Sequence, residues 1–370
     1  MSKHAQRQFG TYYEFFAGGG MVRAGLGRRW KCLLANDVDE KKAASYRQNW
    51  GSAHLQLQDV RELRGADLPG IPDLAWASFP CQDLSLAGAG AGLGGERSGT
   101  FWPFWNLMQK LAGDGRAPRI IALENVCGAL SSHGGKDFAT IANAMTQAGY
   151  RFGALVIDAA YFVPQSRPRL FIVGIHRDCP IPAHLVQSDP DEVWHGKIIT
   201  AAYDKLPKAV KDQWIWWSMP QPKKRRSVLS DLIEDEPKGV PWHTERETQK
   251  LLDMMTPVNN QKVVAAQVSG RPMIGTIYKR TRVDASGRKA QRAEIRFDDM
   301  SGCLRTPGGG SSRQTIMIIN GNDVHSRLLS PREAARLMGL SDRYTLPENR
   351  NEAYHLTGDG VVVPVVRHLA

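Results

Sequence analysis

Short hydrophobic runs alternate with amphipathic stretches through the first half of the chain. Apolar and aromatic runs predict strands, and apolar residues at helical spacing predict helices. Strands that alternate with helices indicate an α/β fold with a doubly wound, mostly parallel sheet. The predicted strands are 11–16, 31–35, 54–57, 74–77, 119–126, 154–157 and 170–173, and the predicted helices are 21–29, 40–49, 100–112 and 137–148.

The alternation ends near residue 180. Tryptophan and proline become frequent there, and a basic run follows at 223–226. Further on, short predicted strands are separated by glycines. We therefore expect a second, smaller and irregular domain that contains β-strands. The large domain is expected at residues 1–183 and 345–370, and the small domain at 184–344.

Two local signals stand near the C-terminal end of the sequence. Ser330-Pro331-Arg332-Glu333 is a capping box with proline at the first helical position, so a helix should begin there. Gly339 should end that helix. Residues 357–364 are predicted to form a turn that leads into an apolar stretch. That stretch is apolar enough to return to the core of the large domain.

A glycine turn, Ala17-Gly18-Gly19-Gly20, joins the first predicted strand to the first predicted helix. Strand, glycine turn and helix in this order are typical of nucleotide-binding α/β domains, because glycines admit a ligand close to the backbone and the helix N-terminus is electropositive. A plain tight turn is the alternative. Asp37 ends the second strand and is placed to accept hydrogen bonds from a ribose, whereas we assign Asp39 to capping the next helix.

Several chemistry-bearing residues follow other predicted strands. Pro80 ends the strand at 74–77, so Cys81 lies in a loop at a strand's carboxyl end, where α/β sheets bind ligands. A buried cysteine that packs as a small hydrophobe is the alternative. Glu124 and Asn125 come after an apolar run, and a partly buried carboxyl group there suits acid catalysis. Arg167 and Arg169 would share one face of an extended segment.

Composition narrows the class of protein. The five cysteines of the 370 residues are scattered without a CxxC pair, so neither zinc, another metal nor a disulfide framework is expected. No apolar run has membrane-spanning length, and the first residues lack the apolar core of a signal peptide, so we expect a cytoplasmic protein. The net charge is +11, and residues 260–313 carry eleven basic against four acidic residues, a net of +7. This region suits a nucleic-acid groove, with a solvated basic face as the alternative.

Taken in order, these motifs resemble the DNA (cytosine-5)-methyltransferase family over almost the whole chain. The Pro-Cys-Gln loop, the Glu-Asn-Val strand end and the Gln-x-Arg-x-Arg segment are together highly specific. The resemblance implies a Rossmann-like, class I S-adenosylmethionine-dependent fold, with a target-recognition domain between the arginine segment and Pro331. The matching stretches are 16–20, 36–37, Asp59, 79–82, 124–126, 165–169, 331–333 and 358–363.

The resemblance also implies catalytic roles. Cys81 would add to C6 of a cytosine flipped out of the duplex, so that C5 can accept a methyl group. Glu124 would hold and protonate N3, and Arg169 would donate to O2. Asn125 would orient the loop around Pro80. Arg167 would support that loop or bind a phosphate.

S-adenosylmethionine is the implied cofactor, lying across the strand ends with Phe16 near its adenine. Asp359 departs from the family's usual Gly-Asn-Ser pattern, and its carboxylate would weaken cofactor binding, alter cofactor preference or reorganise a hydrogen bond. The implied cofactor-binding residues are Phe16, Ala17, Gly18, Gly20, Asp37, Val38, Asp59, Val60, Pro80, Phe101, Asp359, Gly360 and Val361. The implied DNA-binding residues are Gln82, Ser85, Arg280, Arg282, Arg305 and Arg313.

Duplex DNA is the expected partner of an expected monomer, and a cognate restriction endonuclease is a candidate second partner. The same chemistry on tRNA is one alternative, disfavoured by the long basic insert after Arg169. A catalytically weak, DNA-binding or regulatory homologue is another, supported by Asp359 alone. A nicotinamide-dependent oxidoreductase rests only on the glycine turn, and Arg23 stands where its third glycine is needed.

Overall fold

The computed structural model of the chain describes residues 10–80, 98–283, 287–308 and 313–370. They form two compact units. Unit 1 comprises the described residues up to Asp158 together with Pro168–Pro222 and Val365–Ala370, and unit 2 comprises Ala159–Arg167 and Lys223–Pro364. Residues 184–222, which the sequence assigns to the small domain, thus group with unit 1, and residues 345–364 group with unit 2.

Unit 1 is built on a sheet with the strand order β3-β2-β1-β4-β5-β7-β6. Neighbours from β3 to β5 run parallel, and β7 is antiparallel to both β5 and β6, which confirms a mostly parallel sheet. Chain order reverses between β1 and β4, the position where such sheets bind ligands. The strands are β1 (Gly10–Phe15), β2 (Trp30–Asp37), β3 (Leu55–Leu57), β4 (Leu74–Ala77), β5 (Ile120–Asn125), β6 (Tyr150–Asp158) and β7 (Pro168–His176).

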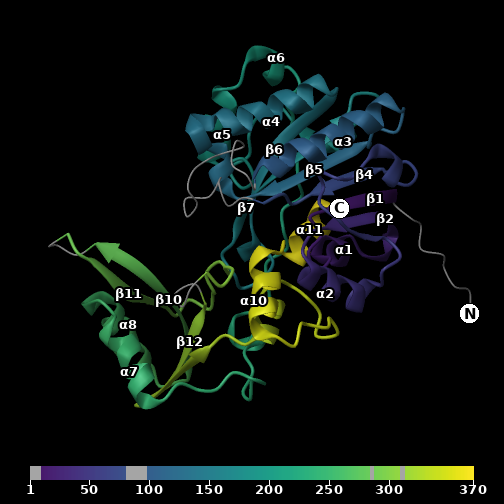
Figure 1. Cartoon of the computed structure of the whole chain (residues 1–370). Helices are drawn as coiled ribbons and strands as arrows, with labels where there is room; N and C mark the ends of the chain where they lie inside the picture. The colour runs from purple at the N-terminus through teal and green to yellow at the C-terminus, as the bar shows by residue number, and fades with distance from the viewer. Residues whose placement is uncertain (1–9, 81–97, 284–286, 309–312) are drawn as a thin grey trace, which may run out of the picture. The chain divides into compact units, whose positions relative to one another are not determined.

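Helices cover both faces of this sheet, with α3 and α4 on one side and α1 and α2 on the other (Figure 1). The apolar positions that predict α4, from Phe138 to Met145, are buried in the main core. Trp214 and Trp216 pack against that core, and the Trp214 ring lies 5.6 Å from Phe152. The helices are α1 (Met21–Leu26), α2 (Glu40–Trp50), α3 (Phe101–Gly113), α4 (Lys136–Gln147), α5 (Lys197–Asp204) and α6 (Lys208–Lys211), and β8 (Val186–Gln187) pairs with β9 (Trp216–Trp217).

Unit 2 contains an antiparallel sheet in the order β11-β10-β12-β13. This sheet confirms the prediction that the smaller domain contains β-strands. Helices α7 and α8 lie beside this sheet (Figure 1), and Leu251 and Val263 share a core with Ile277 and Ile295. The elements are α7 (Glu245–Asp253), α8 (Pro257–Gln267), β10 (Met273–Val283), β11 (Lys289–Arg296), β12 (Thr315–Asn320), β13 (Asp323–Leu328), α9 (Pro331–Leu337) and α10 (Arg350–Asp359), and α11 (Val363–Leu369) continues into unit 1.

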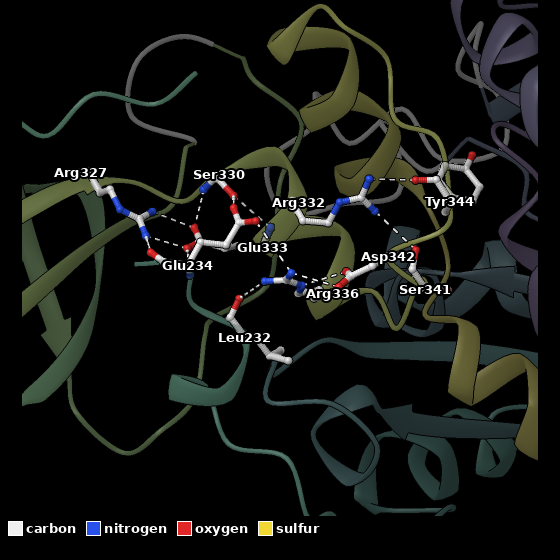
Figure 2. Close-up of polar contacts among 10 residues, drawn as sticks. All are labelled: Leu232, Glu234, Arg327, Ser330, Arg332, Glu333, Arg336, Ser341, Asp342 and Tyr344. Carbon is white, nitrogen blue, oxygen red and sulfur yellow. Dashed lines mark hydrogen bonds and ion pairs between the residues drawn. The ribbon is translucent and has the colours of Figure 1, made fainter. Parts of the chain in front are cut away.

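A buried ion pair fixes the start of α9, as Figure 2 shows. The Arg327 guanidinium donates to both carboxylate oxygens of Glu333, at 2.6 and 2.8 Å, and both side chains are fully buried. Glu333 also accepts the backbone N–H of Ser330, whose hydroxyl accepts the Glu333 N–H in return. The predicted capping box is therefore confirmed, and Glu234 completes it by accepting a bond from the Ser330 hydroxyl.

The predicted turn beginning at residue 357 is wrong in its position. Thr357, Gly358 and Asp359 form the last turn of α10, and the chain leaves the helix only at Gly360. The cause is a tertiary contact that the local sequence does not reveal. A Cβ atom on Gly358 would lie 2.6 Å from the backbone nitrogen of Thr306, so glycine lets this helical turn approach another backbone closely.

Candidate active site

The predicted site residues of unit 1 gather along one edge of its sheet. Parallel strands β1 to β5 present their carboxyl ends there, and the reversed strand β7 presents its amino end. The residues at or just beyond these strand ends are Phe16, Ala17, Gly18 and Gly20 after β1, Asp37 and Val38 at β2, Asp59 and Val60 after β3, Pro80 after β4, Glu124 and Asn125 at β5, and Arg169 at β7.

Asp37 ties the glycine turn to the end of β2. One of its carboxylate oxygens accepts the Gly18 N–H at 2.7 Å, and the other accepts the Asp39 N–H at 2.8 Å. Burial raises the pKa of the Asp37 carboxyl, while those backbone donors and the charge of Lys42 act to lower it. Asp39 caps α2 by accepting the N–H groups of Lys41 and Lys42, as predicted. Each oxygen of Asp37 still has acceptor capacity for a ribose hydroxyl.

A tryptophan that the sequence analysis missed packs beneath the turn. The Trp50 indole donates to the Gly19 carbonyl at 3.0 Å. Gly20 has φ +76°, and a Cβ there would lie 2.5 Å from the indole nitrogen, so glycine is required. Phe16 also adopts a left-handed conformation, with φ +58°. Such backbone strain in a non-glycine residue costs about 1–3 kcal/mol and is concentrated at functional sites.

The surroundings of the turn combine exposed and buried apolar side chains. Val38 is 66% exposed directly beyond β2, although Val60 is buried. Asp59 accepts the Arg61 N–H at 2.8 Å, which fixes its carboxylate beside Val60. Phe101 is fully buried, and its ring centroid lies 5.5 Å from that of Phe79. Phe101 thus supports the backbone just before Pro80.

A carboxylate and a guanidinium meet where β5 and β7 run antiparallel. The Nε of Arg169 lies 3.5 Å from a carboxylate oxygen of Glu124. Both side chains are largely buried, with 17% and 9% of their surfaces exposed. Glu124 pairs with Phe171 across the two strands, which brings the start of β7 to the end of β5. The two predicted catalytic groups are therefore adjacent.

Asn125 holds the chain that leads to the predicted nucleophile. Its amide nitrogen donates to the Phe79 carbonyl at 3.2 Å, and its amide oxygen accepts the Val126 N–H at 2.8 Å. This contact agrees with the predicted role of orienting the loop around Pro80. Cys81, Gln82 and Ser85 lie outside the described residues.

Arg167 belongs to unit 2, where its guanidinium is buried and binds backbone. It donates to the carbonyls of Leu304, Gly358 and Gly360, each at 2.8 Å. The residue is 2% exposed, and these bonds hold backbone segments of unit 2. Support of the loop around Pro80 and contact with a phosphate stay predictions. Arg167 directly precedes β7, which begins at Pro168, so a face shared with Arg169 stays a prediction.

The remaining predicted residues also lie in unit 2. Asp359 is exposed at the last position of α10, Gly360 follows it, and Val361 is buried. Arg280 and Arg282 lie on β10, and Arg305 is exposed beyond β11. Arg313 donates to the Asn351 side chain at 2.6 Å. Arg167 binds the carbonyls on either side of Asp359, so it fixes the backbone of this segment.

The described residues provide neither a cluster of metal ligands nor a membrane-spanning helix. No group of three or more His, Cys, Asp or Glu side chains among them is arranged to hold a metal ion. In the same part of the chain, no helix is both long and apolar enough to cross a membrane. The described cysteines, Cys32, Cys127, Cys179 and Cys303, are not joined in disulfides.

Comparisons with known proteins agree on one family. The family model for C-5 cytosine-specific DNA methylases matches residues 10–370. Type II methyltransferase M.BsuFI from Bacillus subtilis is 24% identical over 97% of this chain and 71% of its own length. Type II methyltransferase M.HhaI from Haemophilus parahaemolyticus is 22% identical, with 97% and 92% covered.

Solved structures show the same fold. The S. pombe Dnmt2 methyltransferase superposes with a TM-score of 0.63 at 15% identity, covering 97% of this chain and 96% of its own. The Entamoeba histolytica methyltransferase EhMeth gives 0.64 at 14% identity, covering 98% and 97%. The family match spans nearly the whole chain. The protein belongs to the C-5 cytosine-specific DNA methylase family and is a DNA (cytosine-5)-methyltransferase.

Proposed function

We propose that the protein transfers a methyl group from S-adenosylmethionine to C5 of a flipped cytosine in a specific duplex sequence, through a covalent bond between Cys81 and C6. One observation carries this proposal. Glu124 and Arg169 meet at 3.5 Å on the sheet edge that also bears the glycine turn and Pro80. N3 and O2 are neighbouring atoms of cytosine, so an acid and a donor at this separation match that edge of the base.

The residues around the glycine turn fit an S-adenosylmethionine molecule. Gly18 and Gly20 have positive φ, and we expect the Asp37 carboxylate to accept hydrogen bonds from ribose hydroxyls. The exposed Val38 offers an apolar contact for an adenine ring at the end of β2. When bound, S-adenosylmethionine supplies an electrophilic methyl group. Phe16, Ala17, Asp59, Val60, Pro80 and Phe101 would complete the site in unit 1. A cofactor-binding role for Asp359, Gly360 and Val361 stays a prediction.

The proposed chemistry begins with the Cys81 thiolate. C5 of cytosine is a poor nucleophile, but addition of the thiolate to C6 gives it enamine character. Glu124 donates a proton to N3 as the electron pair moves into the ring, and Arg169 donates to O2. C5 takes the methyl group as the methyl–sulfur bond breaks, and S-adenosylhomocysteine is the leaving group. C5 then loses its proton to water. The C5–C6 double bond then re-forms, the thiolate leaves, and the N3 proton returns to Glu124.

Asn125 and the strand ends prepare the site for this sequence. The bond from Asn125 to the Phe79 carbonyl fixes the backbone two residues before Cys81. The cytosine must leave the duplex to reach these groups, because its C6 is enclosed in the base stack.

Methyl transfer to different nucleic acids tests the proposal. The purified chain would receive S-adenosylmethionine labelled in its methyl group, with plasmid DNA and tRNA in parallel reactions. We expect label in duplex DNA, and bisulfite sequencing should place it on cytosines of one recurring sequence. Cys81→Ala should abolish transfer, whereas Cys179→Ala serves as the matched control and should retain it. Label in tRNA alone, or DNA binding without any transfer, would contradict the proposal.

The relatives' names also suggest a biological setting. They are type II methyltransferases, so a restriction endonuclease that cuts the same sequence is the proposed functional partner. The protein is proposed to act as a cytoplasmic monomer. Sedimentation of the purified chain, alone and with a target duplex, would test this oligomeric state. A monomer should give one protein molecule per duplex.

A further inference from the structure

The hairpin of β10 and β11 extends beyond the sheet that it belongs to. Strand β10 pairs with β12 only as far as Ile277, but it pairs with β11 to Val283. Among the described residues, Lys279–Val283 and Lys289–Ala293 therefore form a ribbon of two strands, which we call the basic ribbon. Most of its side chains are exposed. A two-stranded ribbon buries little apolar surface and adds little to stability by itself.

The positive charge and the two-stranded form of the basic ribbon suit a groove of duplex DNA. The ten residues of the basic ribbon include five basic residues and no acidic residue. The major groove, about 12 Å wide, admits a two-stranded β-ribbon, and base edges there carry a unique pattern of donors and acceptors. An arginine can donate in bidentate fashion to O6 and N7 of guanine.

A carboxylate next to the ribbon holds two of its arginines. Glu294 accepts from Nε of Arg282 at 2.7 Å, and its second oxygen lies 3.3 Å from Nε of Arg280. The three side chains remain 31–52% exposed. Exposed ion pairs contribute little to stability, about 0–1 kcal/mol. The negative charge of Glu294 also weakens the attraction of the ribbon to phosphate. The effect of Glu294 that favours recognition is therefore to fix the directions of the two guanidinium groups.

An aromatic ring continues the array toward the sheet. The guanidinium carbons of Arg280 and Arg305 lie 5.9 and 5.8 Å from the Tyr278 ring centroid. The Tyr278 hydroxyl donates to the Cys303 carbonyl at 2.6 Å, and a Cβ on Gly302 would lie 2.1 Å from the ring. The ring is therefore locked in place. Arg280 is held by contacts on both sides, from Glu294 and from Tyr278.

We infer that the basic ribbon reads guanine edges in the major groove, with Arg280 and Arg282 making the contacts and Glu294 acting as the positioning residue. This inference rests on the proposed function and names the surface that selects the target sequence. Contact of both arginines with phosphates is the competing explanation. Lysine replaces arginine well against phosphate, but it cannot reproduce a bidentate contact with guanine.

The first experiment therefore uses Arg282→Lys, which keeps the charge. Binding is measured against salt for a target duplex, identified by bisulfite sequencing with the wild-type chain, and for a duplex that lacks the target. We expect the salt slope and the non-target affinity to stay unchanged, and the preference for the target to fall about tenfold or more. Methylation should spread to sites altered at one G·C pair. Arg246→Lys, exposed on α7, is the matched control and should change neither quantity.

The second experiment removes the positioning carboxylate. Glu294→Gln should raise non-target affinity, because a negative charge is lost, and should lower the preference for the target. Glu245→Gln, a matched exposed change on α7, should leave the preference unchanged. Equal gains of Glu294→Gln on both duplexes, or Arg282→Lys with wild-type preference, would overturn the inference and leave the proposed function intact. A wild-type chain that methylates no DNA would refute the proposed function and the inference with it.

Discussion

Replacing Glu14 by glutamine should remove a strong pH dependence from the folding stability of unit 1. Glu14 lies in β1, and its side chain is fully buried. Burial raises the pKa of this carboxyl from 4.5 to about 8. Attraction to Arg23 and to the backbone N–H groups of Val22 and Arg23 opposes the rise only in part.

The direction of the pH dependence follows from the protonation of Glu14 in the folded and unfolded states. In the unfolded chain Glu14 ionises near its ordinary pKa of 4.5, whereas the folded chain keeps the proton up to about pH 8. The unfolded state therefore binds fewer protons between these pH values, and stability is lost as pH rises through them. At about 1.36 kcal/mol per pKa unit, the full loss is on the order of 5 kcal/mol above pH 8 and about 3 kcal/mol at pH 7.

Urea unfolding of wild type and Glu14→Gln from pH 5 to pH 9 checks this magnitude. The two proteins should have similar free energies of unfolding near pH 5, and the variant should be the more stable by several kcal/mol near pH 9. Glu40→Gln is the matched control, because Glu40 is 63% exposed in an ion pair with Arg47 and should add little pH dependence. Parallel pH curves for wild type and Glu14→Gln would refute the reasoning.

Three further substitutions have expected outcomes. Glu124→Gln should reduce single-turnover methyl transfer by roughly 10²–10⁴-fold with duplex binding retained, and a variant that keeps more than a tenth of the rate would exclude an acid role. Gly20→Ala should lower the melting temperature and should weaken S-adenosylmethionine binding, measured by calorimetry. Both effects should be larger than those of Gly27→Ala, because only at Gly20 would an added Cβ meet the Trp50 indole. Glu333→Gln should cost about 3–5 kcal/mol in urea unfolding by leaving Arg327 buried and unpaired, and a loss below 1 kcal/mol would contradict this.

Local patterns in the sequence predict much of the fold and many of the site positions. Apolar runs and helical spacing locate the strands and helices of unit 1, because burial of one face dictates that spacing. The caps at Asp39 and Ser330 are also predicted, because a helix cap depends only on residues within one helical turn. Strand ends then place Asp37, Glu124 and Asn125 on one edge.

Features that depend on distant contacts are not predictable in this way. Trp50 supports the glycine turn from the far end of α2, and no spacing rule connects the two. Arg167 is recognised as part of a motif, but its burial against three carbonyls depends on segments more than a hundred residues away. The packing of residues 184–222 on unit 1 likewise follows from tryptophan contacts that lack any periodic signal.

A covalent trap tests the central claim most directly. In 5-fluorocytosine the C5 atom carries fluorine, which cannot leave as a proton does. On duplex DNA with this base at the target position, an adduct between the protein and C6 should therefore accumulate. With S-adenosylmethionine present, wild type should give a protein–DNA complex that survives denaturing electrophoresis, and Cys81→Ala should give none. A wild-type chain that methylates ordinary DNA yet forms no such complex, or a Cys81→Ala variant that forms it equally well, would contradict the account.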